Sequence, residues 1–294
     1  MDEKYYVPYN FAAIPREYIA YDTARVVILP APFESTTTFL PGTRNAPTQI
    51  INASGHMELY DEEIDQKTCT IGICTEPELA LPADPPGAVD AIKKAVTKAL
   101  DDGKLVCVIG GEHTLTIGSV EAVRDHYPDL SVLYLDAHAD LRESYGGVEV
   151  NHACVAKHLA ETCPVVQIGV RSLSEEEAPL VNSGNVTTVF AREVHSGYDI
   201  ESVIDKLTEN VYITLDMDVF DPAVMPAVGT PEPGGLDWRQ VNAILETVCE
   251  KRRVCGFDVV ELCPIPASTV SEYVAARLIY RLIGLIARAR KWFS

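Results

Sequence analysis

Short runs of apolar residues, rich in valine and isoleucine, recur along the chain. Within each run the apolar positions are continuous and do not alternate with polar ones. This pattern predicts strands that are buried on both faces, as in a parallel sheet covered by helices. The eight runs are "ARVVILPAP" (24–32), "CTIGIC" (69–74), "KLVCVIGG" (104–111), "SVLYLDAH" (131–138), "VVQIGV" (165–170), "NVTTVF" (185–190), "NVYITLD" (210–216) and "VCGFDVVEL" (254–262).

Stretches with helical spacing lie between most of these runs. In residues 87–104 the apolar positions recur every three to four residues, and residues 237–253 begin with Asp237, which suits a helix N-cap. Strands that alternate with helices predict a parallel sheet with helices on both faces. No linker is visible, so we expect residues 1–294 to form one α/β domain. Such sheets bind ligands beyond the carboxyl ends of their strands.

The composition is that of a globular chain, with 294 residues of which 47% are hydrophobic. The acidic N-terminus does not resemble a signal peptide, and no apolar run is long enough to span a bilayer. The most apolar segment, residues 273–293, is interrupted by Arg277, Arg281 and Arg288. We expect it to form a terminal helix that packs on the domain, although an amphipathic membrane helix is conceivable.

Cysteine usage and charge narrow the class of protein further. Eight scattered cysteines form no CxxC pair, which favours a reduced, cytoplasmic protein without zinc-finger or iron–sulfur chemistry. The net charge of −19 argues against nucleic acid as a partner, because nucleic acid requires a basic surface. A negative field could attract a cationic substrate. It could equally serve solubility or a salty cytosol, and charge alone does not separate these interpretations.

Ligand-type side chains follow three of the apolar runs. They are His113 after the run 104–111, then Asp136, His138 and Asp140 around the end of the run 131–138, and finally Asp216 and Asp218. Because side chains two apart in an extended strand point to the same side, each group converges on one point. Two histidines and four aspartates therefore meet at one edge of the predicted sheet.

The charge of this group favours a pair of divalent cations. Four aspartates carry −4, which two such cations would balance, and carboxylate oxygens with a few imidazoles suit Mn²⁺. Two metals about 3.5–4 Å apart can share a water and lower its pKa. Taken singly, His113 could be structural and an Asp-x-Asp pair could cap a helix or form a turn. Their coincidence at three strand ends favours the metal site.

Several blocks resemble the signatures of the ureohydrolase family, which contains arginases and agmatinases. They are "PGTR" (41–44), "GGEHTLT" (110–116), "DAHADLR" (136–142), "NHAC" (151–154), "ITLDMDVFDPAVMPAVGTPEPGGL" (213–236) and "DVVELCP" (258–264). The resemblance covers most of the chain and is strongest for agmatinases. It implies a three-layer α/β/α fold with a parallel sheet of about eight strands, two Mn²⁺ ions per subunit, and hydrolysis of a guanidino group to urea.

The resemblance also implies roles for individual residues. One Mn²⁺ would be held by His113, Asp136, Asp140 and Asp218, and the other by Asp136, His138, Asp216 and Asp218, with Asp136 and Asp218 bridging. Glu261 would pair with the substrate guanidinium, because a carboxylate fits paired N–H donors. His152 would transfer a proton, for which the pKa of histidine is suited. The alternatives are a capping role for Glu261 and a helix-start role without chemistry for His152.

The substrate implied by the resemblance is agmatine, which would be cleaved to putrescine and urea. Arg142 and Ser172 stand where arginases carry residues that recognise the amino-acid head. A longer alternative is N1-aminopropylagmatine, and arginine or guanidinobutyrate remain open because Arg142 could bind a carboxylate. Proximity to the metal loop makes Glu143, Tyr145 and Asn151 candidates for binding the substrate tail.

Two other classes of function are weighed against this one. A different metal amidohydrolase of related fold would lack the Glu261 block, and a non-catalytic binding protein would have lost a metal ligand or His152. Neither loss is seen in the sequence. The family also implies a homo-trimer or homo-hexamer. From the charge and the lack of a spanning run we expect neither nucleic acid nor a membrane as partner.

Overall fold

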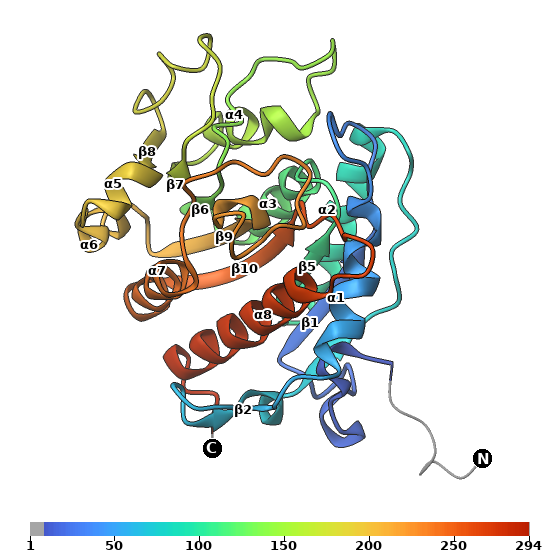
Figure 1. Cartoon of the computed structure of the whole chain (residues 1–294). Helices are drawn as coiled ribbons and strands as arrows, with labels where there is room; N and C mark the ends of the chain where they lie inside the picture. The colour runs from blue at the N-terminus through green and yellow to red at the C-terminus, as the bar shows by residue number, and fades with distance from the viewer. Residues whose placement is uncertain (1–8, 294) are drawn as a thin grey trace.

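The computed structural model describes residues 9–293 and is built around an eight-stranded sheet in which all neighbouring strands are parallel. In spatial order the strands are β4 (Ile73–Thr75), β1 (Val26–Ala31), β5 (Leu105–Gly110), β10 (Arg253–Val260), β9 (Asn210–Asp216), β6 (Leu130–Leu135), β7 (Val165–Val170) and β8 (Val186–Phe190). The predicted α/β fold with a parallel sheet of about eight strands is confirmed. Helices lie on both faces, so the architecture is a three-layer α/β/α sandwich (Figure 1).

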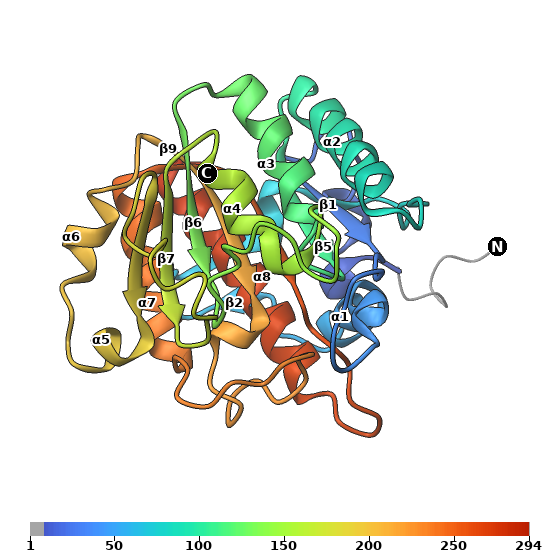
Figure 2. The same cartoon turned by 90° about the horizontal axis from the view of Figure 1, so that it is seen from above.

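The helices divide between the two faces of the sheet (Figure 2). One face carries α2 (Pro85–Asp101), α3 (Leu115–His126) and α4 (Val155–Ala160). The other carries α1 (Ala46–Ser54), α5 (Ala191–His195), α6 (Ile200–Ile204), α7 (Trp238–Lys251) and α8 (Val270–Ala289). Single turns of 3-10 helix are η2 (Phe11–Ala13), η3 (Arg16–Tyr18), η4 (Thr43–Asn45), η5 (Thr68–Ile71), η6 (His152–Cys154) and η7 (Met217–Val219).

The continuous apolar runs are explained by burial on both sides of the sheet. In β1, Val26 and Ile28 join one hydrophobic cluster, whereas Val27 and Leu29 join the other. Because side chains alternate between the faces of a strand, covering both faces requires apolar residues at every position. The period of two is therefore present in the structure but hidden in the sequence.

One predicted strand is only half correct. The run 69–74 forms η5 in its first part, and β4 begins at Ile73. Gly72 separates the two with a φ of 83°, which side chains with a Cβ rarely adopt. A Cβ at this position would also press on the backbone of Ala24. Glycine at position 72 therefore allows the chain to turn here before it enters the sheet.

The C-terminal segment packs on the domain as predicted. Helix α8 is buried along most of its length, and its Arg281 pairs with Asp61 at 3.1 Å. Asp61 belongs to a small antiparallel pair of strands, β2 (Tyr60–Asp61) and β3 (Gln66–Lys67). No helix within residues 9–293 has the length and hydropathy needed to cross a membrane. The predicted N-cap of α7 is also present, because Asp237 accepts a hydrogen bond from the backbone N–H of Gln240.

Candidate metal centre and active site

The predicted site residues meet because their strands are neighbours. β5, β10, β9 and β6 lie side by side in the centre of the sheet, and each is followed by ligand-type side chains at its carboxyl end. A cavity of about 220 Å³ opens there. Its lining includes His113, His138, Asp140, His152, Asp216, Asp218 and Glu261. Asp136 lies buried beneath it and contacts both His113 and His138.

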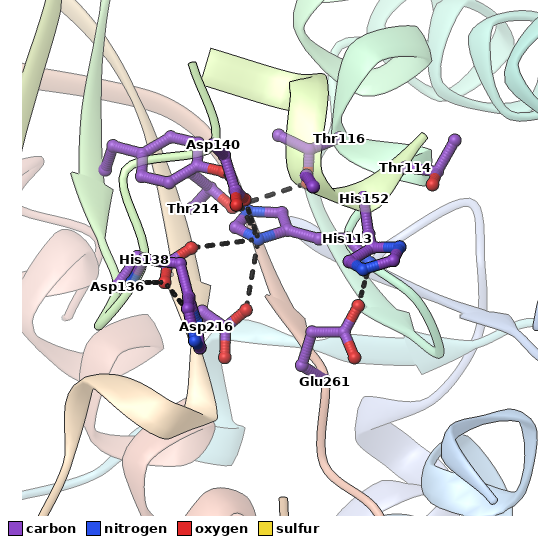
Figure 3. A network of polar contacts seen from close by, with 12 residues as sticks. His113, Thr114, Thr116, Asp136, His138, Asp140, His152, Thr214, Asp216 and Glu261 are labelled. Carbon is purple, nitrogen blue, oxygen red and sulfur yellow. Dashed lines mark hydrogen bonds and ion pairs between the residues drawn. The ribbon is translucent and has the colours of Figure 1, made fainter. Parts of the chain in front are cut away.

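His113 stands among several carboxylates (Figure 3). Its Nδ1 lies 3.2 Å from Asp136 Oδ2, 3.1 Å from Asp216 Oδ2 and 3.6 Å from Asp140 Oδ2. The ring is 1% exposed and stacks on Tyr134, whose hydroxyl donates to Asp140 Oδ2 at 2.7 Å. His113, Asp136 and Asp140 therefore form one group of atoms suited to hold a cation.

The opposite nitrogen of His113 is held by a hydroxyl. Its Nε2 lies 2.9 Å from Thr214 Oγ1, and Thr214 donates its single hydroxyl proton to buried Asp258 at 2.6 Å. The oxygen of Thr214 must therefore accept from Nε2–H. When the ring is neutral, Nδ1 then carries the lone pair and faces the carboxylates, which is the arrangement that a metal ligand needs.

A second group of ligand-type side chains surrounds His138. Asp136, His138 and Asp218 form this group, with His138 Nδ1 at 2.9 Å from Asp218 Oδ2 and 3.5 Å from Asp136 Oδ1. The resemblance assigned Asp218 to both metals and Asp216 to the His138 side. In the structure Asp216 contacts His113 and Asp218 contacts His138. Asp218 lies two residues after Asp216, in η7, and its backbone N–H donates to Asp216 Oδ1 at 2.9 Å. The division of the ligands between the two metals stays a prediction.

The protonation of the cluster reflects its crowding. Burial and the neighbouring carboxylates raise the pKa of Asp140 to about 8 and that of Asp216 well above its usual range. Burial disfavours the charged form of His113 and His138, but the adjacent aspartates outweigh it and raise both pKa values. Asp136 Oδ2 is buried and has no hydrogen-bond partner among residues 9–293. This oxygen lies 3.2 Å from His113 Nδ1 but accepts no hydrogen bond from the described residues. Together with the set of oxygen and imidazole donors, it fits divalent cations.

Glu261 and His152 complete the cavity wall. Glu261 follows β10 at a positive φ of 61°, and its Oε1 accepts the backbone N–H of His113 at 2.7 Å. Burial and the nearby charge of Glu112 raise the pKa of Glu261 to about 8. His152 begins η6, and its ring meets the edge of Tyr145 at 6.0 Å between centroids. Burial lowers the pKa of His152, which keeps its ring neutral at physiological pH.

Of the three residues expected to bind the substrate tail, one lines the cavity. Tyr145 lines the cavity and lies beneath the guanidinium of Arg142, at 5.0 Å from the ring centroid. The side chain of Glu143 is 85% exposed and pairs with Lys157, so it faces solvent. Asn151 is buried and caps η6 by accepting from the N–H of Ala153. Proximity in sequence was misleading for Glu143, whose side chain points to solvent, and for Asn151, whose side chain caps η6.

Other residues of the site were not found from the sequence. Glu177 lines the cavity, lies 3.7 Å from Arg142 Nε and accepts from the N–H groups of Leu141 and Ser174. It is the third member of an ordinary acidic run, and no sequence signal distinguishes it. Arg171 donates to the carbonyl oxygen of Asp218 at 2.7 Å and so holds the segment after β9 in place.

Comparison with known proteins supports the resemblance over most of the chain. The model of the arginase family matches residues 24–284. The chain is 36% identical to the N(1)-aminopropylagmatine ureohydrolase of Synechocystis sp., over 94% of this chain and 96% of that protein. It is 35% identical to the agmatinase of Pyrococcus horikoshii, over 90% of this chain and 93% of that protein. Its structure superimposes on the agmatine ureohydrolase of Thermoplasma volcanium with a TM-score of 0.88, at 29% identity and over 98% and 97% of the two chains. The chain therefore belongs to the arginase family.

Proposed function

We propose that this enzyme hydrolyses the guanidino group of agmatine to urea and putrescine with two Mn²⁺ ions. As an arginase-family member it is a hydrolase acting on the C–N bonds of amidines. The observation that carries the proposal is the pair of ligand groups that share Asp136, next to the carboxylate of Glu261 in one cavity.

The proposed metal ligands are divided by the observed contacts. On the His113 side they are Asp136, Asp140 and Asp216, and on the His138 side they are Asp136 and Asp218. When bound, two divalent cations lower the pKa of a water and stabilise negative charge near the reacting carbon. Asp136, which contacts both histidines, is the carboxylate best placed to serve both cations.

The remaining residues act on the substrate itself. In this proposal Glu261, which lines the cavity, accepts N–H donors of the guanidinium, and this cation would favour the charged form of the carboxylate. A guanidinium carbon is a poor electrophile, so positioning it against the nucleophile contributes a large part of the rate enhancement. His152, with a lowered pKa, is neutral and able to take a proton and pass it to the departing amine.

The cavity wall supports a preference for an amine over an amino acid. Among the residues of 9–293 that line the cavity, Arg142 is the only cation apart from the histidines, and its charge is partnered by Glu177. A substrate carboxylate would have to compete with this pair or remain unpaired, which is costly. An amine meets the opposite condition, because the net charge of −19 favours cations.

A second candidate substrate is N1-aminopropylagmatine. Two relatives with this name, from Synechocystis sp. and Thermus thermophilus, are each 36% identical to the chain over more than nine-tenths of its length. Both candidates share the guanidinium and a cationic tail, so they differ only in what lies beyond the first amine.

The proposal is tested by measuring urea release from four compounds in the presence of Mn²⁺. The ratio kcat/KM for agmatine, N1-aminopropylagmatine, arginine and guanidinobutyrate reports differential binding of the transition state. We expect both amines to exceed arginine and guanidinobutyrate. A higher ratio for either carboxylate would contradict the proposed substrate class, and absence of urea from all four would contradict the proposed function.

A further inference from the structure

Glu112 is a buried carboxylate beside the site, and each of its acceptor positions is filled by a hydrogen-bond donor. Its Oε2 accepts the backbone N–H groups of Ser35 at 2.8 Å and Thr36 at 2.7 Å. Its Oε1 accepts the hydroxyl protons of Thr36 and Thr114, the latter at 2.5 Å. A carboxylate offers about four acceptor positions, so four donors satisfy Glu112 completely although it is 0% exposed. Glu112 thus fixes the loop of Thr36 firmly against the site.

The hydroxyl of Thr36 is shared between Glu112 and His152. Thr36 Oγ1 lies 2.9 Å from His152 Nδ1, and it also accepts the backbone N–H of His152 at 3.4 Å. A threonine hydroxyl has one proton, and a carboxylate can only accept. Because that proton is donated to Glu112, the bond to His152 needs its proton from the ring. Nδ1 of His152 must therefore be protonated and donate to Thr36.

We infer that Glu112 and Thr36 are positioning residues that hold His152 in its Nδ1–H tautomer, with Nε2 left as the basic nitrogen. Neutral histidine otherwise chooses between two tautomers, and its ring can flip. With Nδ1 anchored, the only site for an added proton is Nε2. The inference rests on the proposed function for the role of His152 as proton carrier, whereas the tautomer itself does not depend on it.

The same chain of hydrogen bonds also stabilises the His152 ring during the step in which it carries a second proton. When Nε2 takes a proton, the positive charge strengthens the bond from Nδ1–H to Thr36, because charged donors bind more tightly. The buried negative charge of Glu112 lies one hydroxyl away and stabilises the cation. The proton at Nδ1 stays on the ring throughout, and the proton gained at Nε2 leaves with the amine.

The tautomer can be observed directly by NMR. The full-length protein is labelled with ¹⁵N-histidine and prepared without metal, and the His152 signals are identified by their loss in His152→Asn. We expect a pyrrole-type Nδ1 and a pyridine-type Nε2 in the wild type, and a shift toward the other tautomer in Thr36→Val. A pyridine-type Nδ1 in the wild type overturns the inference, even where the valine variant fails to fold.

Kinetics test whether this positioning matters to the reaction. Thr36→Val keeps the shape of the side chain but removes the hydroxyl, and we expect kcat to fall roughly tenfold, the effect of one hydrogen bond. KM and bound metal should be unchanged, and Thr36→Ser, the matched variant that keeps the hydroxyl, should recover most of the loss. An unchanged kcat in Thr36→Val, or a loss that occurs through KM or metal content, overturns the positioning role.

The two experiments separate this inference from the proposed function. If no guanidino compound is hydrolysed, the proposed function fails, and the NMR result still decides the tautomer of His152. If urea is released but His152 carries its proton on Nε2, the function stands and the inference fails.

Discussion

Two histidines of the site are oriented in opposite senses by the same kind of partner. Asp258 acts through the hydroxyl of Thr214 on Nε2 of His113, which turns Nδ1 toward the carboxylates. The hydroxyl of Thr36 lies instead against Nδ1 of His152. Because a hydroxyl that donates to a carboxylate can only accept from a ring, its position selects the ring nitrogen that remains free.

Asp136 is the residue whose loss should affect both cations. In Asp136→Asn the shape is kept but one negative charge is removed from both ligand groups. We expect bound Mn²⁺, measured by elemental analysis after gel filtration, to fall from two per chain toward zero. In Asp218→Asn bound Mn²⁺ should fall only to about one per chain, because Asp218 contacts the His138 side.

A matched control is Asp221→Asn. Asp221 forms a turn by accepting the backbone N–H groups of Ala223 and Gly234, and we expect this variant to keep both ions. Full metal content in Asp136→Asn would contradict the proposed sharing of this carboxylate.

His152→Ala should reduce turnover without loss of metal. The expected fall in kcat is roughly 100- to 10,000-fold, the usual contribution of a positioned proton carrier. Bound Mn²⁺ should stay near the wild-type level, because His152 belongs to neither ligand group. Steady-state kinetics across pH provide the measurement, and a variant with an unchanged kcat at every pH would rule out the role.

At the scale of elements, the ends of neighbouring strands bring the site residues together. A glycine allows one of these strand ends to approach the neighbouring backbone closely. Gly111 follows β5 and lies against the backbone of Phe33, where a Cβ would overlap the carbonyl oxygen. The backbone N–H of Glu112 donates to this same oxygen at 2.9 Å. The segment that positions His113 therefore depends on close contact between two backbones, which only glycine permits.

Gly111→Ala should consequently weaken both the fold and the metal site. The overlap with Phe33 forces a backbone shift, and we expect the free energy of unfolding to drop by about 1–3 kcal/mol. Urea denaturation measures this drop, and a titration with Mn²⁺ should show weaker binding on the His113 side. Gly55→Ala is the matched control, since a Cβ there meets only ordinary contacts and should change stability by less than about 0.5 kcal/mol. Equal stability of both variants would contradict this account.

At the scale of the whole molecule, a large net negative charge accompanies a site that is itself rich in buried carboxylates. The net charge is −19, and four buried aspartates of the cluster share a small volume with two histidines. Burial and mutual repulsion raise the pKa of Asp140 to about 8, and the neighbouring aspartates raise the pKa of both histidines. Without a cation the cluster therefore holds protons at neutral pH.

Metal binding should accordingly be coupled to proton release. A raised pKa means that a group is protonated below that pH, so protons compete with the cation there and competition ends as pH rises past it. We expect the apparent affinity for Mn²⁺ to increase with pH through about 8, where Asp140 loses its proton, and to keep rising above it because the pKa values of His113 and His138 are also raised. Calorimetry in two buffers of different ionisation enthalpy should reveal protons released on binding. An affinity that does not depend on pH would contradict the protonated state of the cluster.

The sequence by itself indicated the strands, the helices α2, α7 and α8, and the ligand-type residues that gather at the strand ends. Continuous apolar runs indicated all eight strands, and the alternation of side chains showed that Asp136, His138 and Asp140 converge. The strand prediction failed in part at residues 69–74 because the chain turns at Gly72, and a hydrophobicity pattern does not reveal such a turn. The division into a single domain and the trimeric or hexameric assembly stay predictions.

Only the tertiary structure decided which of these groups touch. It placed Asp216 on His113 and Asp218 on His138, turned Glu143 to solvent, and brought Thr36 to His152 across 116 positions of sequence. The physical reason is that periodicity reports the direction of a side chain relative to its own element. A hydrogen bond between distant segments depends instead on how loops are packed over the sheet, and that packing is set by the whole chain at once.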